Sequence, residues 1–66
     1  MNLIVNGETH VHNGQGTIVE FLRECQADPP RTAIMINGEV VPRQRWDSVR
    51  LCESDHVELL VFAGGG

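Results

Sequence analysis

Short apolar runs that end in Asn-Gly pairs are the clearest pattern along the chain. Asn6-Gly7 follows the apolar run 3–5, and Asn37-Gly38 follows a second run of the same kind. Asn-Gly between apolar runs is typical of a tight β-hairpin, because a type I′ turn needs positive φ at both central residues. The pattern therefore predicts two β-hairpins.

Between the two hairpins, apolar residues recur with the spacing of a helix. Four of them fall at i, i+3, i+4 and i+7, on one face of an α-helix: Ile18, Phe21, Leu22 and Cys25. Thr17 and Glu20 match a capping box, with Thr17 as the N-cap and Glu20 at the third helical position. The Asp-Pro-Pro sequence at 28–30 is expected to end the helix, since a residue before proline is pushed out of the α region.

The segment 42–53 shows neither the apolar spacing of a helix nor the alternation of a strand. Its expected anchors are Trp46 and Leu51. A last strand is expected over 56–62. Successive side chains of a strand point to opposite faces. The set that we expect to pack on the helix is Val57, Leu59 and Val61, because the other set contains the charged Glu58.

The order hairpin, helix, hairpin, irregular crossing and strand predicts an α+β fold. One helix would pack across one face of a small mixed β-sheet. A chain of 66 residues and 7.3 kDa is expected to form a single domain. We place this domain at 1–62 and a flexible glycine tail at 63–66.

The second face of the predicted sheet has no helix to cover it. Leu60 and Phe62 are expected on this open face, beside Met35 and Ile4. An exposed apolar patch of this kind often marks a site for a partner. The alternative is that the loop around Trp46 folds over the patch, or that its residues are half buried.

Composition and charge narrow the classes of function. The chain is 41% hydrophobic, has a net charge of −4, and contains five Arg but no Lys. An acidic domain without a basic cluster repels nucleic acids and anionic membranes, so neither is an expected partner. The start of the chain lacks the basic region of a signal peptide, and no apolar run has the length of a membrane span. With only two cysteines, we expect a cytoplasmic protein with free thiols.

The last three residues are Gly64, Gly65 and Gly66. Glycine has the widest backbone freedom, so such a tail can enter a narrow site and present its terminal carboxylate. This carboxylate is an anion at pH 7 and a poor electrophile, so another protein must activate it, for instance by transferring AMP from ATP. The alternatives are a frayed terminus and a cloning scar.

This order of elements with a glycine end resembles the ubiquitin-like sulfur carriers, and within them the ThiS family of thiamine biosynthesis. The residues that carry the resemblance extend over nearly the whole chain: Val5-Asn6-Gly7, Ile34 to Asn37, Val41-Pro42-Arg43 followed by Trp46, and Asp55 to Val61 before the glycines. Ser54 departs from the family pattern, in which we expect Gly before Asp55. The third glycine is another departure, since many members end in two.

The resemblance implies a β-grasp fold and a carrier function. An adenylating enzyme related to ubiquitin-activating enzymes would use Mg-ATP to form an acyl-adenylate on Gly66. A cysteine desulfurase would supply sulfur through a persulfide, and the end of the chain would become a thiocarboxylate. Thiazole synthase would then take the sulfur for the thiazole ring of thiamine. The chain itself would be a co-substrate rather than an enzyme, with no bound cofactor or metal.

Under this interpretation, Gly64, Gly65 and Gly66 form the reactive end. The residues expected to contact partners are Phe62, Leu60, Met35, Arg43 and Ala63. Three alternatives stay open. They are a carrier for molybdopterin or another sulfur metabolite, a ubiquitin-like modifier that attaches to target lysines, and an interaction domain with an idle tail.

Several residues allow a second interpretation. His10 and His12 lie at i and i+2 and could bind a metal with a third ligand from His56 or an acid, but a solvated outer face is the interpretation we favour. Cys25 is expected to act as a small apolar residue on the helix. Cys52, in the turn before the last strand, is an alternative carrier of a persulfide, although the sequence places no Lys and, apart from His56, no His near it.

Arg43 and Arg45 lie close to Trp46 in the sequence. They could pair with acidic residues of a partner, with Trp46 as an anchor, since Trp and Arg are favoured at the centres of interfaces. The other interpretation is that Trp46 covers one end of the core and that both Arg side chains are solvated.

Overall fold

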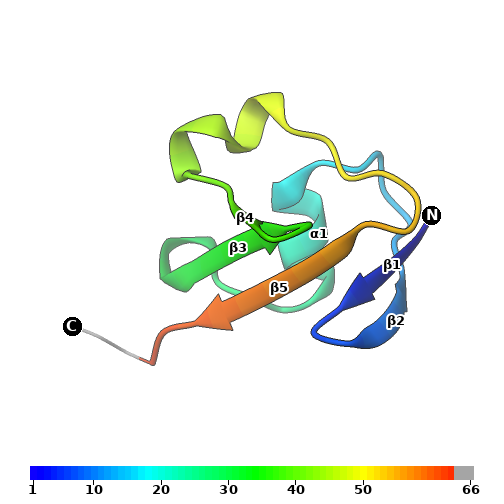
Figure 1. Ribbon diagram of the computed structural model, residues 1–66. Coiled ribbons are helices and arrows are strands. Elements are labelled where there is room, and N and C mark those ends of the chain that lie inside the picture. The colour runs from blue at the N-terminus through cyan, green and yellow to red at the C-terminus, as the bar shows by residue number, and fades with distance from the viewer. Residues whose placement is uncertain (64–66) are drawn as a thin grey trace.

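The computed structural model describes residues 1–63, so Gly64, Gly65 and Gly66 lie outside the described residues. Its elements, in chain order, are β1 (Asn2–Val5), β2 (Glu8–Val11), α1 (Ile18–Glu24), the 3₁₀-helix η1 (Pro29–Arg31), β3 (Thr32–Ile36), β4 (Glu39–Val40), the 3₁₀-helix η2 (Arg43–Ser48) and β5 (His56–Val61). Figure 1 shows β5 running through the middle of the sheet toward the C-terminus.

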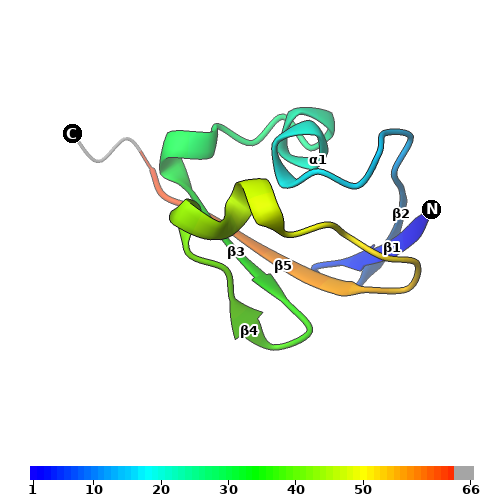
Figure 2. The same ribbon diagram turned by 90° about the horizontal axis from the view of Figure 1, so that it is seen from above.

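The sheet has five strands in the order β2-β1-β5-β3-β4. β1 and β5 are parallel, whereas the other neighbouring strands are antiparallel, so the sheet is mixed. Figure 2 shows α1 and η2 on the same side of this sheet, while no helix formed by residues 1–63 covers the other side. The predicted arrangement of one helix across a small mixed sheet is therefore confirmed, and η2 adds a second covering element.

Both predicted hairpins are present. β1 pairs with β2 and β3 pairs with β4, and each pair is joined by Asn-Gly. Asn6 and Gly7 have φ of 50° and 86°, and Asn37 and Gly38 have φ of 51° and 86°. Positive φ at both central residues is the requirement of a type I′ turn, which explains why these two positions hold Asn and Gly.

The start of α1 was predicted correctly, but its end was not. The Thr17 hydroxyl accepts a hydrogen bond from the Glu20 N–H at 3.2 Å, as expected of an N-cap. The helix ends at Glu24 rather than at the Asp-Pro-Pro sequence, because Gln26 has a φ of 57° and reverses the chain. The Ala27 N–H then donates to the Leu22 carbonyl and the Gln26 N–H to the Arg23 carbonyl, the two bonds of a Schellman motif.

The core lies between the sheet and the layer of α1 and η2. It consists of Leu3, Ile18, Phe21, Leu22, Ala27, Ile34, Trp46, Leu51 and Val57. Three of the four residues on the predicted helical face are fully buried, and Cys25, at the C-cap, is half-buried. Trp46 and Leu51 anchor the irregular segment as expected.

The expectation that Val57, Leu59 and Val61 all pack on the helix is wrong at Val61. Val57 is buried and Leu59 is half-buried, but 59% of Val61 is exposed. A helix of seven residues is only about 10 Å long, whereas positions four residues apart on a strand are separated by about 13 Å. α1 therefore covers the sheet at Val57 and does not reach Val61.

Candidate functional site

The candidate site is the C-terminal end of β5 together with the sheet face around it. β5 is held between β1 and β3, so its position depends on both hairpins. Beyond Val61, the Phe62 N–H still donates to the Arg31 carbonyl at 2.8 Å. This bond keeps the chain aligned with β3 up to Phe62. The central strand of the fold thus directs Phe62 and Ala63 outward, toward the C-terminus (Figure 1).

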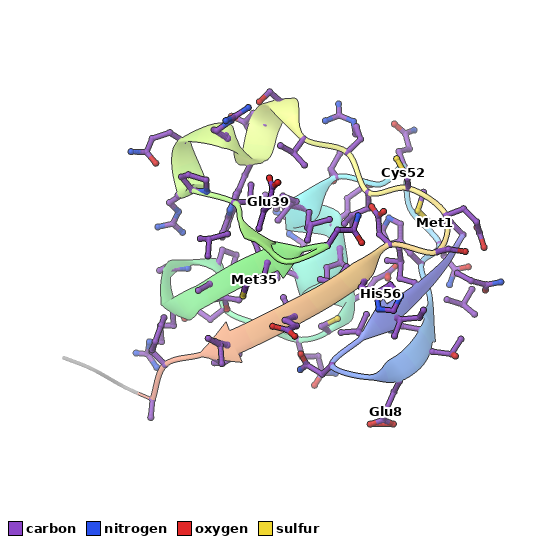
Figure 3. The ribbon with its side chains drawn as sticks, in the orientation of Figure 1. Met1, Glu8, Met35, Glu39, Cys52 and His56 are labelled. Atoms are coloured by element: carbon purple, nitrogen blue, oxygen red, sulfur yellow. The ribbon has the colours of Figure 1, made fainter. Side chains whose placement is uncertain are left out.

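Leu60 and Met35 lie on the open face of the sheet. Residues paired across neighbouring strands point to the same face. Leu60 pairs with Ala33, and Met35 pairs with Glu58 on one side and with Val40 on the other. Leu60 is 59% exposed, while Met35 is half-buried. Figure 3 shows the Met35 side chain on β3.

The open face also contains Ile4, but at a different place from the one expected. Ile4 pairs with His56, at the beginning of β5, whereas Leu60 lies four residues further along the strand. Ile4 is therefore not a neighbour of Leu60. Phe62 is 59% exposed, and Ala63 is exposed beyond it. Leu60, Phe62 and Ala63 follow one another along the path to the C-terminus.

Arg43 is not part of the open face. It begins η2, on the α1 side of the sheet, and its guanidinium carbon lies 5.2 Å from the centre of the Trp46 ring. The Trp46 ring is buried, and its N–H donates to the Val41 carbonyl at 3.0 Å. Trp46 thus covers the core, which is the second of the two interpretations given above. The Arg43 guanidinium stacks on the Trp46 ring as a cation on an aromatic ring.

A shallow groove connects the surroundings of Arg43 with the edge of the open face. It has a volume of about 280 Å³ and lies where β4 leaves the sheet after two residues. Its walls come from η1, β3, β4 and η2, and Ala33 and Val40 belong both to this groove and to the open face. The groove therefore continues the apolar surface around β3.

The interpretation of His10 and His12 as a solvated outer face is wrong. His10 pairs with the buried Leu3, so both histidines point toward α1, and His12 is 1% exposed. The side chains of His10 and His12 lie 3.0 Å and 2.9 Å from the same carboxylate oxygen of Glu24. The Asn13 N–H donates to the other oxygen of Glu24 at 2.9 Å.

This cluster holds the hairpin against the helix. The Gly16 N–H donates to His12 Nε2 at 3.0 Å, so His12 carries its proton on Nδ1 and donates it to Glu24. Both nitrogens of His12 are then engaged, and neither has a free lone pair for a metal. Within residues 1–63, no group of three metal-ligating side chains is close enough to hold an ion. Sequence reasoning missed Glu24, although the spacing of the two histidines did place both on one face.

The charge of Glu24 depends on its partners. Desolvation raises the pKa of the Glu24 carboxyl, but hydrogen bonds from His10, His12 and the Asn13 N–H outweigh it and lower the pKa from 4.5 to about 2. The carboxylate is therefore ionised throughout the physiological range. It has the role of a structural hydrogen-bond acceptor between α1 and β2.

The two thiols differ in environment. Burial raises the pKa of the Cys25 thiol, and the adjacent Glu24 carboxylate raises it further. A protonated thiol is a poor nucleophile, so Cys25 fits the structural role expected for it. Cys52 is exposed on the loop before β5 (Figure 3), at the opposite end of that strand from Ala63.

Comparison with known proteins assigns this chain to a protein family. Residues 3–66 match the ThiS family. The chain belongs to the ThiS family. Among curated proteins, it is similar to the sulfur carrier protein ThiS of Bacillus subtilis, with 33% identity over 51 residues that cover 77% of each chain. It is also similar to a thiazole synthase of Paramagnetospirillum magneticum, with 32% identity over all 66 residues.

The chain spans only 20% of the length of that thiazole synthase, and the same holds for the thiazole synthase of Magnetococcus marinus, to which it is 33% identical. Among solved structures, the ThiS protein of Geobacter metallireducens aligns over the full length of both chains with a TM-score of 0.81 and 35% identity. The solution structure of a thiamine biosynthesis protein from the same organism aligns with a TM-score of 0.79. The β-grasp fold expected of a ThiS family member is thereby confirmed.

The ThiS family pattern also explains Ser54. We expected Gly before Asp55, and the structure gives Ser54 a φ of 69°. This is a left-handed conformation that glycine adopts without steric cost. The departure in sequence places a serine at this left-handed position. The predicted reactive residues, Gly64, Gly65 and Gly66, lie outside the described residues.

Within residues 1–63, no helix combines the length and the apolar character that crossing a membrane requires.

Proposed function

We propose that this chain is a sulfur carrier of thiamine biosynthesis and that the carboxylate of Gly66 carries the sulfur. The observation that supports this most directly is the match to the ThiS family over residues 3–66. The direction of β5 is consistent with it, since the strand leads through Phe62 and Ala63 toward the glycines. Partner proteins can then reach Ala63, which is exposed, without unfolding the domain.

The proposed chemistry has three steps. The Gly66 carboxylate attacks the α-phosphate of Mg-ATP on an adenylating enzyme, giving an acyl-adenylate and pyrophosphate. The terminal sulfur of a persulfide, supplied from cysteine by a desulfurase, then attacks the acyl carbon and expels AMP. A thiol finally cleaves the S–S bond, is oxidised to a disulfide, and leaves the thiocarboxylate. ATP and Mg²⁺ are substrates of the activating enzyme in this scheme.

In this proposal the chain is a co-substrate, and its own side chains perform no step. The clustered titratable groups, Glu24 with His10 and His12, connect β2 to α1 and are engaged with one another. Cys25 is half-buried, and its raised pKa keeps the thiol protonated. The domain therefore serves as a handle that partner enzymes recognise.

The proposed acceptor of the sulfur is thiazole synthase. Support comes from two relatives named thiazole synthase, each of which contains a region similar to this whole chain. We further propose that the adenylating enzyme and thiazole synthase contact the open face around Leu60 and Phe62. Because both would use one surface, each should compete with the other for this chain.

The test is intact and fragment-resolved mass spectrometry after incubation with the adenylating enzyme of the same host, Mg-ATP, a desulfurase and cysteine. Replacement of one oxygen by sulfur has nearly the mass of an added oxygen, so the shift must be localised to the glycines and separated from oxidation of Met or Cys. The matched control is a Cys25→Ser, Cys52→Ser double variant, which has no thiol for a persulfide. We expect both proteins to gain sulfur on Gly66.

A chain that stays unmodified, while a known ThiS carrier is converted in a parallel reaction, would contradict the proposal. Loss of the sulfur in the double variant would instead assign the carriage to a cysteine.

A further inference from the structure

The main chain of β5 is paired on its two sides over different lengths. On the β3 side, the register extends from Val57, opposite Ile36, to Val61, opposite Thr32, and the Phe62 N–H adds a further bond to Arg31. On the β1 side, the register contains only His56 and Val57. The C-terminal part of the central strand is therefore an edge on its β1 side.

The hydrogen bonds toward β1 can be followed residue by residue. The carbonyls of Asp55 and Val57 accept from the N–H groups of Ile4 and Asn6, both at 2.9 Å. The side-chain amide of Asn6 then bonds both main-chain groups of Leu59, at 3.0 Å to its N–H and 3.5 Å to its carbonyl. Asn6 thus prolongs β1 by one position with its side chain.

The next residue in this row is Val61. Main-chain groups of a strand point alternately to its two sides, so the N–H and carbonyl of Val61 point the same way as those of Leu59. β1 ends at Val5 and turns into β2 at Asn6-Gly7. Within residues 1–63, no group is hydrogen bonded to the Val61 main chain on this side.

The side chains around this edge are apolar and exposed. Leu60, Val61 and Phe62 are each 59% exposed, although they belong to or follow directly on the central strand. An edge with unpaired N–H and carbonyl groups pairs readily with another strand, and proteins usually cover or interrupt such edges. Here the edge stays open where the chain leads to the glycines.

We propose that an extended main-chain segment of the adenylating enzyme pairs with this edge at Val61 and adds a strand to the sheet. The inference rests on the proposed function. A carbonyl of the segment would accept from the Val61 N–H, and an N–H of the segment would donate to the Val61 carbonyl. Its apolar side chains would lie beside Leu60 on one face and beside Val61 on the other.

The adenylating enzyme is the partner that most needs this contact. Activation of the terminal carboxylate requires the residues before it to be held in one orientation relative to ATP. Pairing at Val61 extends a strand that β3 already holds straight. The segment would thus align Phe62 and Ala63 with the strand and direct the terminal carboxylate into the enzyme.

Val61→Pro tests the main-chain bond. Proline has no N–H, and it is tolerated in a strand where that N–H does not pair. The N–H of Val61 pairs with no group within residues 1–63, so Val61→Pro should keep the melting temperature within about 3 °C of the wild type. The matched control, Val61→Thr, keeps the N–H and the β-branched shape. The measurement is kcat/KM for formation of the acyl-adenylate, followed as pyrophosphate release.

We expect Val61→Pro to lower kcat/KM by about tenfold or more, because a buried acceptor of the enzyme loses its donor, and Val61→Thr to stay within about threefold. Equal values for the wild type and Val61→Pro would overturn the inference, as would an equal loss in both variants. If the wild type itself releases no pyrophosphate, it is the proposed function that fails.

A second measurement holds even if Val61→Pro does not fold. Amide hydrogen exchange of the wild-type chain is compared with and without the adenylating enzyme. The Val61 amide should exchange rapidly in the free chain and at least about tenfold more slowly in the complex, because its N–H becomes hydrogen bonded. An unchanged Val61 amide in a formed complex would overturn the inference.

Discussion

Left-handed backbone at non-glycine residues reveals the strain in this small domain. Within residues 1–63, four such residues have positive φ: Asn6, Gln26, Asn37 and Ser54. The left-handed region costs an ordinary residue about 1–2 kcal/mol, and Asn tolerates it better because its side chain bonds locally. Asn6 and Asn37 also bond main-chain groups of β5. Within residues 1–63, no group is hydrogen bonded to the Ser54 side chain, so no such bond compensates the strain there.

Ser54→Gly should therefore stabilise the protein. We expect the free energy of unfolding to rise by about 0.5–1 kcal/mol, because relief of the left-handed strain exceeds the added entropy of the unfolded chain. Thermal or urea unfolding measures the change. The control is Ser48→Gly, at the end of η2, where φ is not positive and the same substitution should destabilise. A lower stability for Ser54→Gly would contradict the interpretation of the turn.

Glu24 is a second residue whose importance depends on its surroundings. The pKa of the Glu24 carboxyl is about 2 in the folded protein, whereas its ordinary value is 4.5. The folded protein therefore binds the carboxyl proton less tightly than the unfolded chain does. The stabilisation from Glu24 is then fully present above pH 4.5 and is lost as the pH falls toward 2. The hydrogen bonds from His10, His12 and the Asn13 N–H are the cause, since they favour the charged carboxylate.

Glu24→Gln should be less stable than the wild type at pH 6, and the difference should shrink toward pH 2.5. The ionised acceptor shared by two histidines is absent from the variant at every pH, whereas the wild type loses it only in acid. Urea unfolding at both pH values measures the difference. Glu8→Gln, at the exposed start of β2, is the control and should follow the wild type. A difference independent of pH would contradict the assignment.

At the level of elements, the stability of α1 depends on the residues at its start. A helix of seven residues has two turns, so the unpaired N–H groups at its start are a large part of all its main-chain donors. Thr17 accepts from Glu20 and donates its hydroxyl to the Glu20 carboxylate at 2.8 Å. That carboxylate also accepts from the Gln15 N–H at 3.1 Å, which joins the preceding turn to the helix.

Thr17→Ala should lower the free energy of unfolding by about 1 kcal/mol, because it removes the cap. Thr17→Ser retains a hydroxyl and should restore most of the stability. Thermal unfolding of the two variants in parallel gives the comparison. Equal destabilisation by Ala and Ser would show that the methyl group of Thr17, rather than its hydroxyl, is what matters.

For the whole molecule, the two faces of the sheet have different roles. α1 and η2 cover one face and form the core with it (Figure 2). The exposed apolar residues of the open face include Leu60 on β5 and Val11 on β2. Of these two residues, Leu60 is the one that lies beside the path of the chain to the C-terminus. This separation allows the docking proposal to be tested with matched substitutions.

Leu60→Asp should lower kcat/KM for formation of the acyl-adenylate by at least about tenfold, as expected at the centre of an interface. Val11→Asp is the control, since Val11 is 57% exposed and Leu60 is 59% exposed. The kcat/KM of Val11→Asp should stay within about twofold of the wild type, because β2 is an outer strand that β1 separates from β5. Equal activity of the two variants would remove Leu60 from the docking surface.

Local patterns in the sequence were sufficient for the two hairpins, the start of the helix, the last strand and the order of these elements. Asn-Gly between apolar runs predicted both hairpins, and Thr17 with Glu20 predicted the start of α1, because turns and caps depend on residues a few positions apart. The glycine end with Val41-Pro42-Arg43 and Trp46 indicated the family, to which the chain belongs. The predicted site residues Leu60, Phe62 and Ala63 do follow one another at the end of β5.

Tertiary structure alone decided which side chains meet and how far each contact extends. No local rule joins Glu24 to His10 and His12, places Arg43 on Trp46, or exposes Val61 at the end of the central strand. These features depend on the length of α1 and on where β1 stops relative to β5. Both are properties of elements packed against one another, so a periodicity read along one segment does not contain them.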